Sequence, residues 1–232
     1  MSIAENIRII RKQIDEAAIA AGRDPKSIQL CAATKMNNAE NVRAVIAAGV
    51  DCCGENRVQE LVQKMAENAY EGAPVHFIGH LQTNKVRQVV GRVSLIQSVD
   101  SLRLLNAIQE EACKQNIVQD ILLEINIGEE PSKSGFLLSE IYDVCEKISN
   151  FPNIRVEGFM VIPPISQNSG DNRKFFQKIC NLAVDITRKK YDNVWVRILS
   201  MGMSDDFQDA IACGSTMIRI GTAIFGARDY TK

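Results

Sequence analysis

Residues 28–53 read IQLCAATKMNNAENVRAVIAAGVDCC, and this stretch decides which fold the sequence predicts. Residues 28–34 form a short apolar run that is typical of a buried strand. Residues 39–48 have the spacing of an amphipathic helix that ends at Gly49, and a second apolar run follows at residues 50–53. A helix between two strands favours a parallel pair, because parallel neighbours need a crossover of about a dozen residues.

The same alternation of strand and helix continues along the rest of the chain. Eight runs have the length and composition of strands: 28–34, 50–53, 75–78, 95–99, 121–127, 156–161, 194–199 and 217–220. Most gaps between them hold a segment of helical pattern: 39–48, 57–69, 84–90, 102–115, 138–148, 173–190 and 205–212. Eight such units in 232 residues predict an α/β protein with a single (β/α)₈ TIM barrel. An open, doubly wound parallel sheet is the alternative.

A further helix is predicted before the first strand. Ser2 and Glu5 form a capping-box pattern, and apolar residues then recur at helical spacing until Gly22. A chain of 232 residues allows one large domain or two small ones. Because no segment reads as a long linker, we expect residues 1–232 to form one barrel domain with an extra N-terminal helix and no second catalytic domain.

Composition and charge exclude several classes of protein. Hydrophobic residues make up 46% and the formal net charge is −1, so neither disorder nor general attraction to nucleic acid or a membrane is expected. The seven cysteines contain no C-x-x-C pair, and we interpret them as reduced core thiols. Only His76 and His80 could join them, so no metal site is predicted. The N-terminus lacks the pattern of a signal peptide, and we expect a cytoplasmic monomer.

The barrel prediction directs attention to the residue that follows the first strand, Lys35. In this fold the active site is built at the carboxyl ends of the strands. A lysine at the end of a buried strand is costly unless it is paired or neutral, and desolvation lowers its pKa. A neutral amine is a nucleophile that can form a Schiff base with an aldehyde. The alternative is a lysine that reaches solvent and has no function.

The loops after the seventh and eighth strands predict a phosphate site. Residues 200–206, read as SMGMSDD, offer a turn of small residues with Ser204 as a candidate N-cap, and Gly221 and Thr222 follow the last strand. Arg219 lies within that apolar strand and needs an acceptor, which is either a buried carboxylate or a ligand. A lysine, an arginine and a phosphate cradle at one mouth suggest a phosphorylated aldehyde.

Six stretches of the sequence, taken together, resemble the pyridoxal phosphate homeostasis proteins, also called the YggS/PROSC family. They are AATK at 32–35, GENRVQE at 54–60, HFIGHLQTNK at 76–85, SKSGF at 132–136, SMGMSDD at 200–206 and RIGTAIFG at 219–226. The resemblance implies a barrel like the N-terminal domain of alanine racemase that holds pyridoxal 5′-phosphate (PLP) as an aldimine of Lys35. It also implies that the phosphate is held by Ser200, Gly221 and Thr222, that Arg219 faces the pyridine nitrogen, and that the pocket is lined by Asn56 and Met203. His80 receives no role from it.

These implied residues favour a binding protein over an enzyme. An arginine beside the pyridine nitrogen should leave that nitrogen unprotonated and weaken the cofactor as an electron sink, which is compatible with racemase-like chemistry but hostile to demanding carbanion reactions. Lys35 is the one plausible acid or base that the sequence suggests, so racemisation with two bases is not expected. We therefore predict a protein that holds PLP and contributes to its intracellular homeostasis without catalytic turnover, with PLP-dependent apo-enzymes as recipients. The alternatives are a PLP-dependent amino-acid racemase and, more distantly, a sugar-phosphate isomerase. No residue is assigned a catalytic role.

Overall fold

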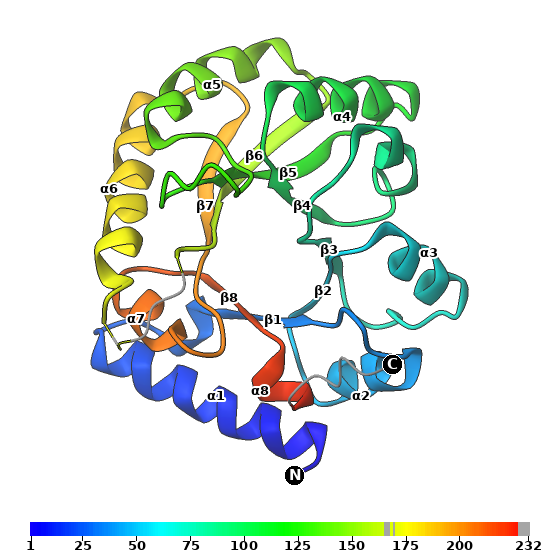
Figure 1. Ribbon diagram of the computed structural model, residues 1–232, viewed down its shortest axis with the longest axis vertical. Helices are drawn as coiled ribbons and strands as arrows, with labels where there is room; N and C mark the ends of the chain where they lie inside the picture. Colours follow the sequence, from blue (N-terminus) through cyan, green and yellow to red (C-terminus); the bar gives the residue numbers. More distant parts are fainter. Residues whose placement is uncertain (165–167, 169, 227–232) are drawn as a thin grey trace.

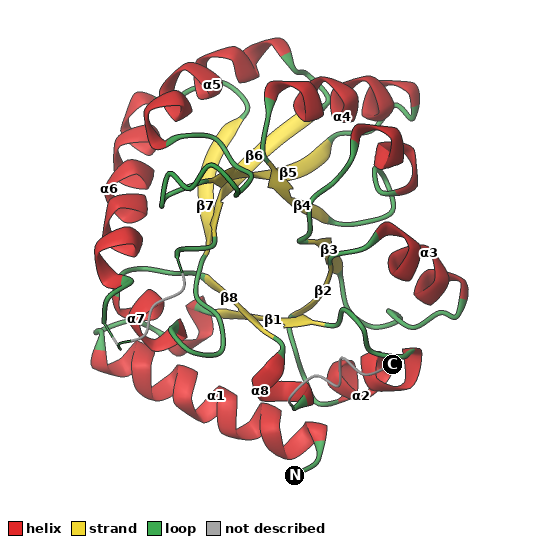
Figure 2. Ribbon diagram, in the orientation of Figure 1, coloured by secondary structure: helices red, strands yellow, loops and turns green. Residues whose placement is uncertain are grey.

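The computed structural model describes residues 1–164, 168 and 170–226. Its eight parallel strands form one closed barrel in the order of the sequence, with helices around the outside (Figures 1 and 2). The strands are β1 (Gln29–Ala33), β2 (Cys52–Glu55), β3 (Val75–Phe77), β4 (Leu95–Val99), β5 (Gln119–Ile125), β6 (Ile154–Val161), β7 (Val194–Ser200) and β8 (Met217–Ile220). The prediction of a (β/α)₈ barrel is confirmed, and the open sheet is wrong because β1 pairs with β8.

The helices follow the predicted alternation with three local differences. They are α1 (Ile3–Ala20), α2 (Ala39–Ala47), α3 (Val58–Ala66), α4 (Leu102–Lys114), α5 (Ile141–Lys147), α6 (Arg173–Lys189), α7 (Phe207–Ala212) and α8 (Thr222–Phe225). The helix predicted at 84–90 is a 3₁₀ helix, Thr83–Gln88. The one predicted at 138–148 begins and ends in 3₁₀ turns, Leu138–Glu140 and Ile148–Asn150, on either side of α5. The third difference is α8, which was not predicted because a helix of four residues is too short to show an apolar pattern.

The second strand lies two residues later than the apolar run suggests. Cys31 pairs with Cys52 and Ala33 with Gly54, so the register with β1 defines β2 as Cys52–Glu55. Asp51, just before the strand, accepts a hydrogen bond from the backbone of Leu30 at 2.6 Å. This shift brings a charged residue, Glu55, inside the sheet, where its side chain is buried.

The N-terminal helix completes the outer layer. Helix α8 has four residues and cannot cover the seam where β8 meets β1. Helix α1 lies along that seam, beside α7, α8 and α2 (Figure 1). Its predicted capping box is present, and it buries a stripe at helical spacing, Ile7, Ile10, Ile14 and Ala18. Helix α1 thus covers the part of the barrel that α8 is too short to cover.

All seven cysteines are free, and their burial differs. Four are buried, Cys31, Cys52, Cys53 and Cys145, whereas Cys180 and Cys213 are partly exposed and Cys113 is exposed. The interpretation of all seven as core thiols is therefore wrong for Cys113, which lies on the polar face of α4. Among the described helices, none is long and apolar enough to cross a bilayer.

Candidate functional site

A cavity of about 460 Å³ opens at the carboxyl ends of the barrel strands. It is lined by residues from the ends of β1, β2, β3, β5, β6, β7 and β8, which is where this fold places its active sites. Six of the seven predicted site residues lie on its wall: Lys35, Asn56, Met203, Arg219, Gly221 and Thr222. The seventh, Ser200, does not line this cavity.

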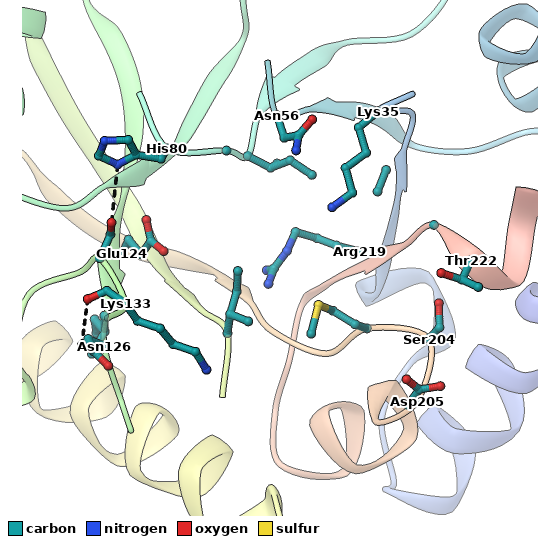
Figure 3. A pocket seen from close by; sticks show the side chains of 18 residues that line it. Lys35, Asn56, His80, Glu124, Asn126, Lys133, Ser204, Asp205, Arg219 and Thr222 are labelled. Carbon is teal, nitrogen blue, oxygen red and sulfur yellow. Dashed lines mark hydrogen bonds between the residues drawn. The ribbon is translucent and has the colours of Figure 1, made fainter. Parts of the chain in front are cut away.

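The labelled side chains fall into two groups on opposite sides of the cavity (Figure 3). Lys35 and Thr222 lie on one side and His80 and Glu124 on the other, with the guanidinium of Arg219 between them and Asn56 at the edge between the two groups. The Asn56 side-chain oxygen is buried and has no hydrogen-bond partner among the described residues. A buried acceptor of this kind is costly unless a ligand or water donates to it.

The loops after β7 and β8 meet at the cavity. The backbone N–H of Ala223 in α8 lies 3.4 Å from Ser204 Oγ, and both Ser204 and Thr222 line the wall. The prediction that Ser204 caps α7 is wrong, because α7 begins at Phe207 and the cap position belongs to Asp206. The Asp206 carboxylate accepts a hydrogen bond from the N–H of Met203 at 2.8 Å, which folds the loop. Because Ser204 does not cap α7, its side chain lies at the cavity wall.

Ser200 lies inside the barrel with its residue fully buried. Its hydroxyl donates to Gln97 Oε1 at 2.6 Å and accepts from the guanidinium of Arg219 at 2.6 Å. The other end of the Gln97 amide extends this series of hydrogen bonds, because its Nε2 atom lies 2.9 Å from His76 Nδ1. In this structure Ser200 contacts Arg219 and Gln97, and its predicted role as a phosphate ligand stays a prediction.

Arg219 enters the cavity from β8 with only 5% of its surface exposed. Its guanidinium donates to the backbone oxygen of Ser200 at 2.7 Å and to that of Val161 at 2.9 Å. Burial lowers the pKa of this group, although the ordinary value is so high that it stays charged. Among the described residues, no carboxylate forms an ion pair with Arg219, and its guanidinium is held at the cavity wall by neutral acceptors on Ser200 and Val161.

The sequence interpretation missed Glu124, an acidic residue inside β5 that lines the same cavity. Burial raises its pKa to about 7, with a further contribution from Asp100, while the charge of Arg219 and His80 acts in the opposite direction. Nearby, His80 Nδ1 lies 3.0 Å from Asp100 Oδ2. The signal was present in the run ILLEINI at 121–127, where Glu124 is the one charged residue among apolar residues and Asn126. The cavity therefore holds titratable groups besides Lys35.

Beneath the cavity, Cys31, Cys52 and His76 bring their ligand atoms within 4.8 Å of one another, the one such group among the described residues. A hydrogen bond to Cys31 and then burial raise the pKa of Cys52. Burial lowers the pKa of His76 to about 4. Both shifts favour the neutral forms of Cys52 and His76, and the burial of Cys31 and Cys52 agrees with the interpretation of the two cysteines as core thiols.

Comparison with known proteins agrees with the fold. The family model "Alanine racemase, N-terminal domain" matches residues 2–229, and this class of (β/α)₈ barrel is the one to which the chain belongs. The chain is also 40% identical over 230 residues to a protein of Aquifex aeolicus named "Pyridoxal phosphate homeostasis protein", covering 99% of this chain and 100% of that one. The chain is a member of the pyridoxal phosphate homeostasis protein family.

Solved structures extend the comparison. PipY of Synechococcus elongatus, in a structure with PLP bound, has a TM-score of 0.84 and 30% identity, covering 97% of this chain and 100% of that one. Its structure without PLP has a TM-score of 0.86 at 31% identity, with the same coverage of 97% and 100%. Alanine racemase of Corynebacterium glutamicum has a TM-score of 0.69 at 16% identity over 99% of this chain and 61% of that one, which shows a shared fold.

Proposed function

We propose that this protein binds PLP in the cavity at the carboxyl end of the barrel, holds it through a Schiff base at Lys35, and contributes to intracellular PLP homeostasis. The observation that carries the proposal is the meeting of Lys35, Arg219 and Thr222 at one cavity. The PLP-bound structure of PipY, at 30% identity, supports the choice of ligand.

The residues present fit such a group. A cavity of about 460 Å³ lies within the range of about 300–1,000 Å³ that small-molecule sites occupy. The unpartnered oxygen of Asn56 can accept a hydrogen bond from the phenol of PLP. The donors at the wall, namely the Lys35 amine, the Thr222 hydroxyl and the Arg219 guanidinium, suit an anionic aldehyde.

We assign the individual roles as follows. Gly221 and Thr222 hold the phosphate, Met203 packs against the ligand beside Asn56, and Arg219 faces the pyridine nitrogen. Ser200, which is buried, acts through its hydrogen bond with the Arg219 guanidinium. When bound, PLP supplies an aldehyde for amines and an electron sink for carbanions. A guanidinium donates hydrogen bonds but does not accept them, so Arg219 would donate an N–H to an unprotonated pyridine nitrogen. A carboxylate in the same place would instead accept a hydrogen bond from a protonated nitrogen. Arg219 therefore favours reversible holding of the aldehyde over demanding carbanion chemistry.

The proposal is tested first by the Lys35→Ala variant. The wild-type protein loaded with PLP should show a visible absorbance band that borohydride abolishes by fixing the ligand to the chain. Lys35→Ala should show no such band, whereas Lys12→Ala, at a side chain that is 78% exposed on α1, should keep it. A wild-type protein that gains no band with added PLP would exclude the proposed ligand.

Amino-acid racemisation is the second candidate, and Glu124 is the observation that favours it. A carboxyl group with a pKa near 7 can act as an acid or a base at neutral pH, and it lies across the cavity from Lys35. We propose that turnover is nevertheless absent, because relatives that match this chain over its full length are named homeostasis proteins. Incubation of the loaded protein with L-alanine and other amino acids, followed by a chiral product assay, should yield no D-isomer. Production that depends on both Lys35 and Glu124 would establish the racemase instead.

The remaining partners follow from the binding role. We propose that PLP-dependent apo-enzymes receive the ligand, that the protein acts as a monomer, and that it does so in the cytoplasm, where seven unpaired thiols are stable. Light scattering should give the mass of a single chain. Reconstitution of an apo-enzyme from the loaded protein, compared with an equal concentration of free PLP, tests the transfer.

A further inference from the structure

We infer that Glu55, Glu60 and Lys64 position Lys35 by holding the backbone on both sides of it. The inference rests on the proposed binding of PLP at Lys35. The three residues come from the end of β2 and from α3, outside the cavity, and none of them lines its wall.

Lys64 is the centre of this group, which we call the buried clamp (Glu55, Glu60 and Lys64). Its residue is only 5% exposed although it carries a charge. The Nζ atom lies 2.6 Å from Glu55 Oε1 and 3.4 Å from Glu60 Oε2. Its third contact is the backbone oxygen of Thr34, at 2.9 Å. Three acceptors thus surround the ammonium, which is the condition for keeping a charge buried.

The clamp holds the residue before Lys35 through side chain and backbone. Thr34 is fully buried, and its hydroxyl donates to Glu55 Oε1 at 2.5 Å. Its backbone oxygen receives the bond from Lys64, and its N–H donates to the oxygen of Gly54 at 2.9 Å. Every hydrogen-bonding group of Thr34 therefore has a partner on β2 or α3, and the last residue before Lys35 has a defined position.

The clamp also holds the residue after Lys35. The N–H of Met36 donates to Glu60 Oε2 at 2.6 Å. Met36 has a φ of +62°, in the left-handed region, which non-glycine residues adopt at a cost of about 1 kcal/mol or more. Its side chain is 51% exposed and so contributes little packing to offset that cost. A hydrogen bond to an ionised acceptor is the interaction that stabilises this backbone.

One carboxylate, Glu60, thus contacts both the ammonium of Lys64 and the N–H of Met36, while Lys64 contacts the oxygen of Thr34. The clamp therefore contacts the peptides on both sides of Lys35, in addition to the local turn in which Asn37 donates to the backbone oxygens of Thr34 at 3.2 Å and of Lys35 at 3.0 Å. Because the Cα of Lys35 lies between two fixed peptides, the clamp restricts the directions from which its amine can approach a ligand.

The clamp also gives a role to three charged residues of the motif that begins at the end of β2 and that do not line the cavity. In GENRVQELVQK, residues 54–64, Asn56 reaches the cavity wall, whereas Glu55, Glu60 and Lys64 turn to the opposite side and hold the neighbouring strand. Glu60 and Lys64 are four residues apart on α3, a spacing that places them on one helix face.

The test compares three variants in the protein without ligand. Glu60→Ala removes the acceptor of Met36, Glu60→Gln restores a neutral acceptor, and Glu55→Gln combined with Lys64→Met removes the buried charges as a pair, so that neither is left uncompensated. Hydrogen exchange of the Met36 amide should be at least about tenfold faster in Glu60→Ala, since a bond to a charged acceptor contributes roughly 1.5–3 kcal/mol. Glu60→Gln should recover part of this protection.

The acylation rate of the Lys35 amine, followed by peptide mass spectrometry across pH, should shift in Glu60→Ala and in the double variant.

PLP affinity supplies the second readout. Glu60→Ala and the double variant should bind PLP about tenfold or more weakly than the wild type. The matched control is Glu157→Gln, which alters another buried carboxylate in an ion pair, with Arg155 on β6 at 2.8 Å. It should change melting temperature without changing Lys35 acylation or PLP affinity.

The possible outcomes separate the clamp from the proposed function. If the variants melt earlier but keep wild-type Met36 exchange, Lys35 acylation and PLP affinity, the clamp is structural only and the inference is wrong. If the wild-type protein binds no PLP, the proposed function fails, and the exchange and acylation measurements still decide whether the clamp positions Lys35.

Discussion

Glu124 follows Leu122 by two residues on β5, so both side chains point to the inside of the barrel. Leu122 packs there with Leu95 and Met160, whereas Glu124 reaches the cavity at the open end. A carboxyl group at the border between an apolar core and a polar cavity loses much of its hydration, and this is why its pKa rises to about 7. At the scale of single residues, the position of an inward-pointing side chain along β5 decides whether it packs in the core or lines the cavity.

The raised pKa of Glu124 predicts a pH-dependent stability. The unfolded chain releases this proton near pH 4.5 and the folded protein near pH 7, so the folded state binds more protons in between and its stability falls as pH rises through this window. Glu124→Gln removes the effect. Urea unfolding should show that the free-energy difference between this variant and the wild type grows by up to about 3 kcal/mol from pH 4.5 to pH 7.5. Parallel pH profiles would contradict the raised pKa.

At the scale of elements, the ends of neighbouring strands are set by how closely they pack. Gly79 follows β3, and a Cβ atom there would lie 2.2 Å from the backbone oxygen of Asn56, at the end of β2. No such contact is tolerated between real atoms, so the side chain at residue 79 must be absent for Asn56 to reach the cavity wall. The glycine in GHLQ, residues 79–82, therefore has a packing role.

Gly79→Ala should displace Asn56 and weaken PLP binding by about tenfold or more, because overpacking of this kind costs roughly 1–3 kcal/mol. Gly22→Ala is the matched control. Its φ is +69°, but a Cβ there meets no atom within 4 Å, so it should cost about 1 kcal/mol of stability and leave PLP binding unchanged. A titration of both variants with PLP, followed by absorbance, measures the difference. Equal affinities would argue against a packing role for Gly79.

At the scale of the whole molecule, the first helix and the last strand depend on each other. Asn6 in α1 donates to the backbone oxygen of Ile224 in α8 at 2.8 Å, across almost the full length of the chain. The seam between β8 and β1 is thus covered by residues from both ends of the sequence. We propose that residues 1–232 fold as one domain, because the N-terminal helix has its apolar partners in the C-terminal units.

Ile14→Ala tests this dependence. Ile14 is 1% exposed, so its truncation should lower the free energy of unfolding by about 2–5 kcal/mol. Ile19→Ala, on the same helix but 66% exposed, should change it by less than about 0.5 kcal/mol. Far-UV and near-UV circular dichroism should report one coincident transition for both variants. Separate transitions in Ile14→Ala would mean that α1 is an independent unit.

The recurring strand and helix pattern was sufficient to predict the barrel, its eight strands and the capped first helix, because period and capping are local properties of the chain. Six of the predicted site residues lie on the cavity wall, since the ends of parallel strands must meet, whereas their roles toward a ligand stay predictions. The pattern misjudged Ser204, because Asp206 two residues later takes the cap position. It also misjudged the start of β2 and the acidic residue in β5, both of which depend on neighbours distant in sequence.

The sequence by itself determined the order of the elements and which end of the barrel carries the polar residues, since both follow from local hydrophobic periodicity and from the direction of the chain. Only the tertiary structure decided which way individual polar side chains turn. Ser200 lies under Arg219, Glu124 lies at the cavity with a pKa near 7, and Lys64 lies buried against Glu55. The physical reason is that desolvation and hydrogen bonding depend on atoms brought together by strand pairing, and these contacts join residues far apart in the chain.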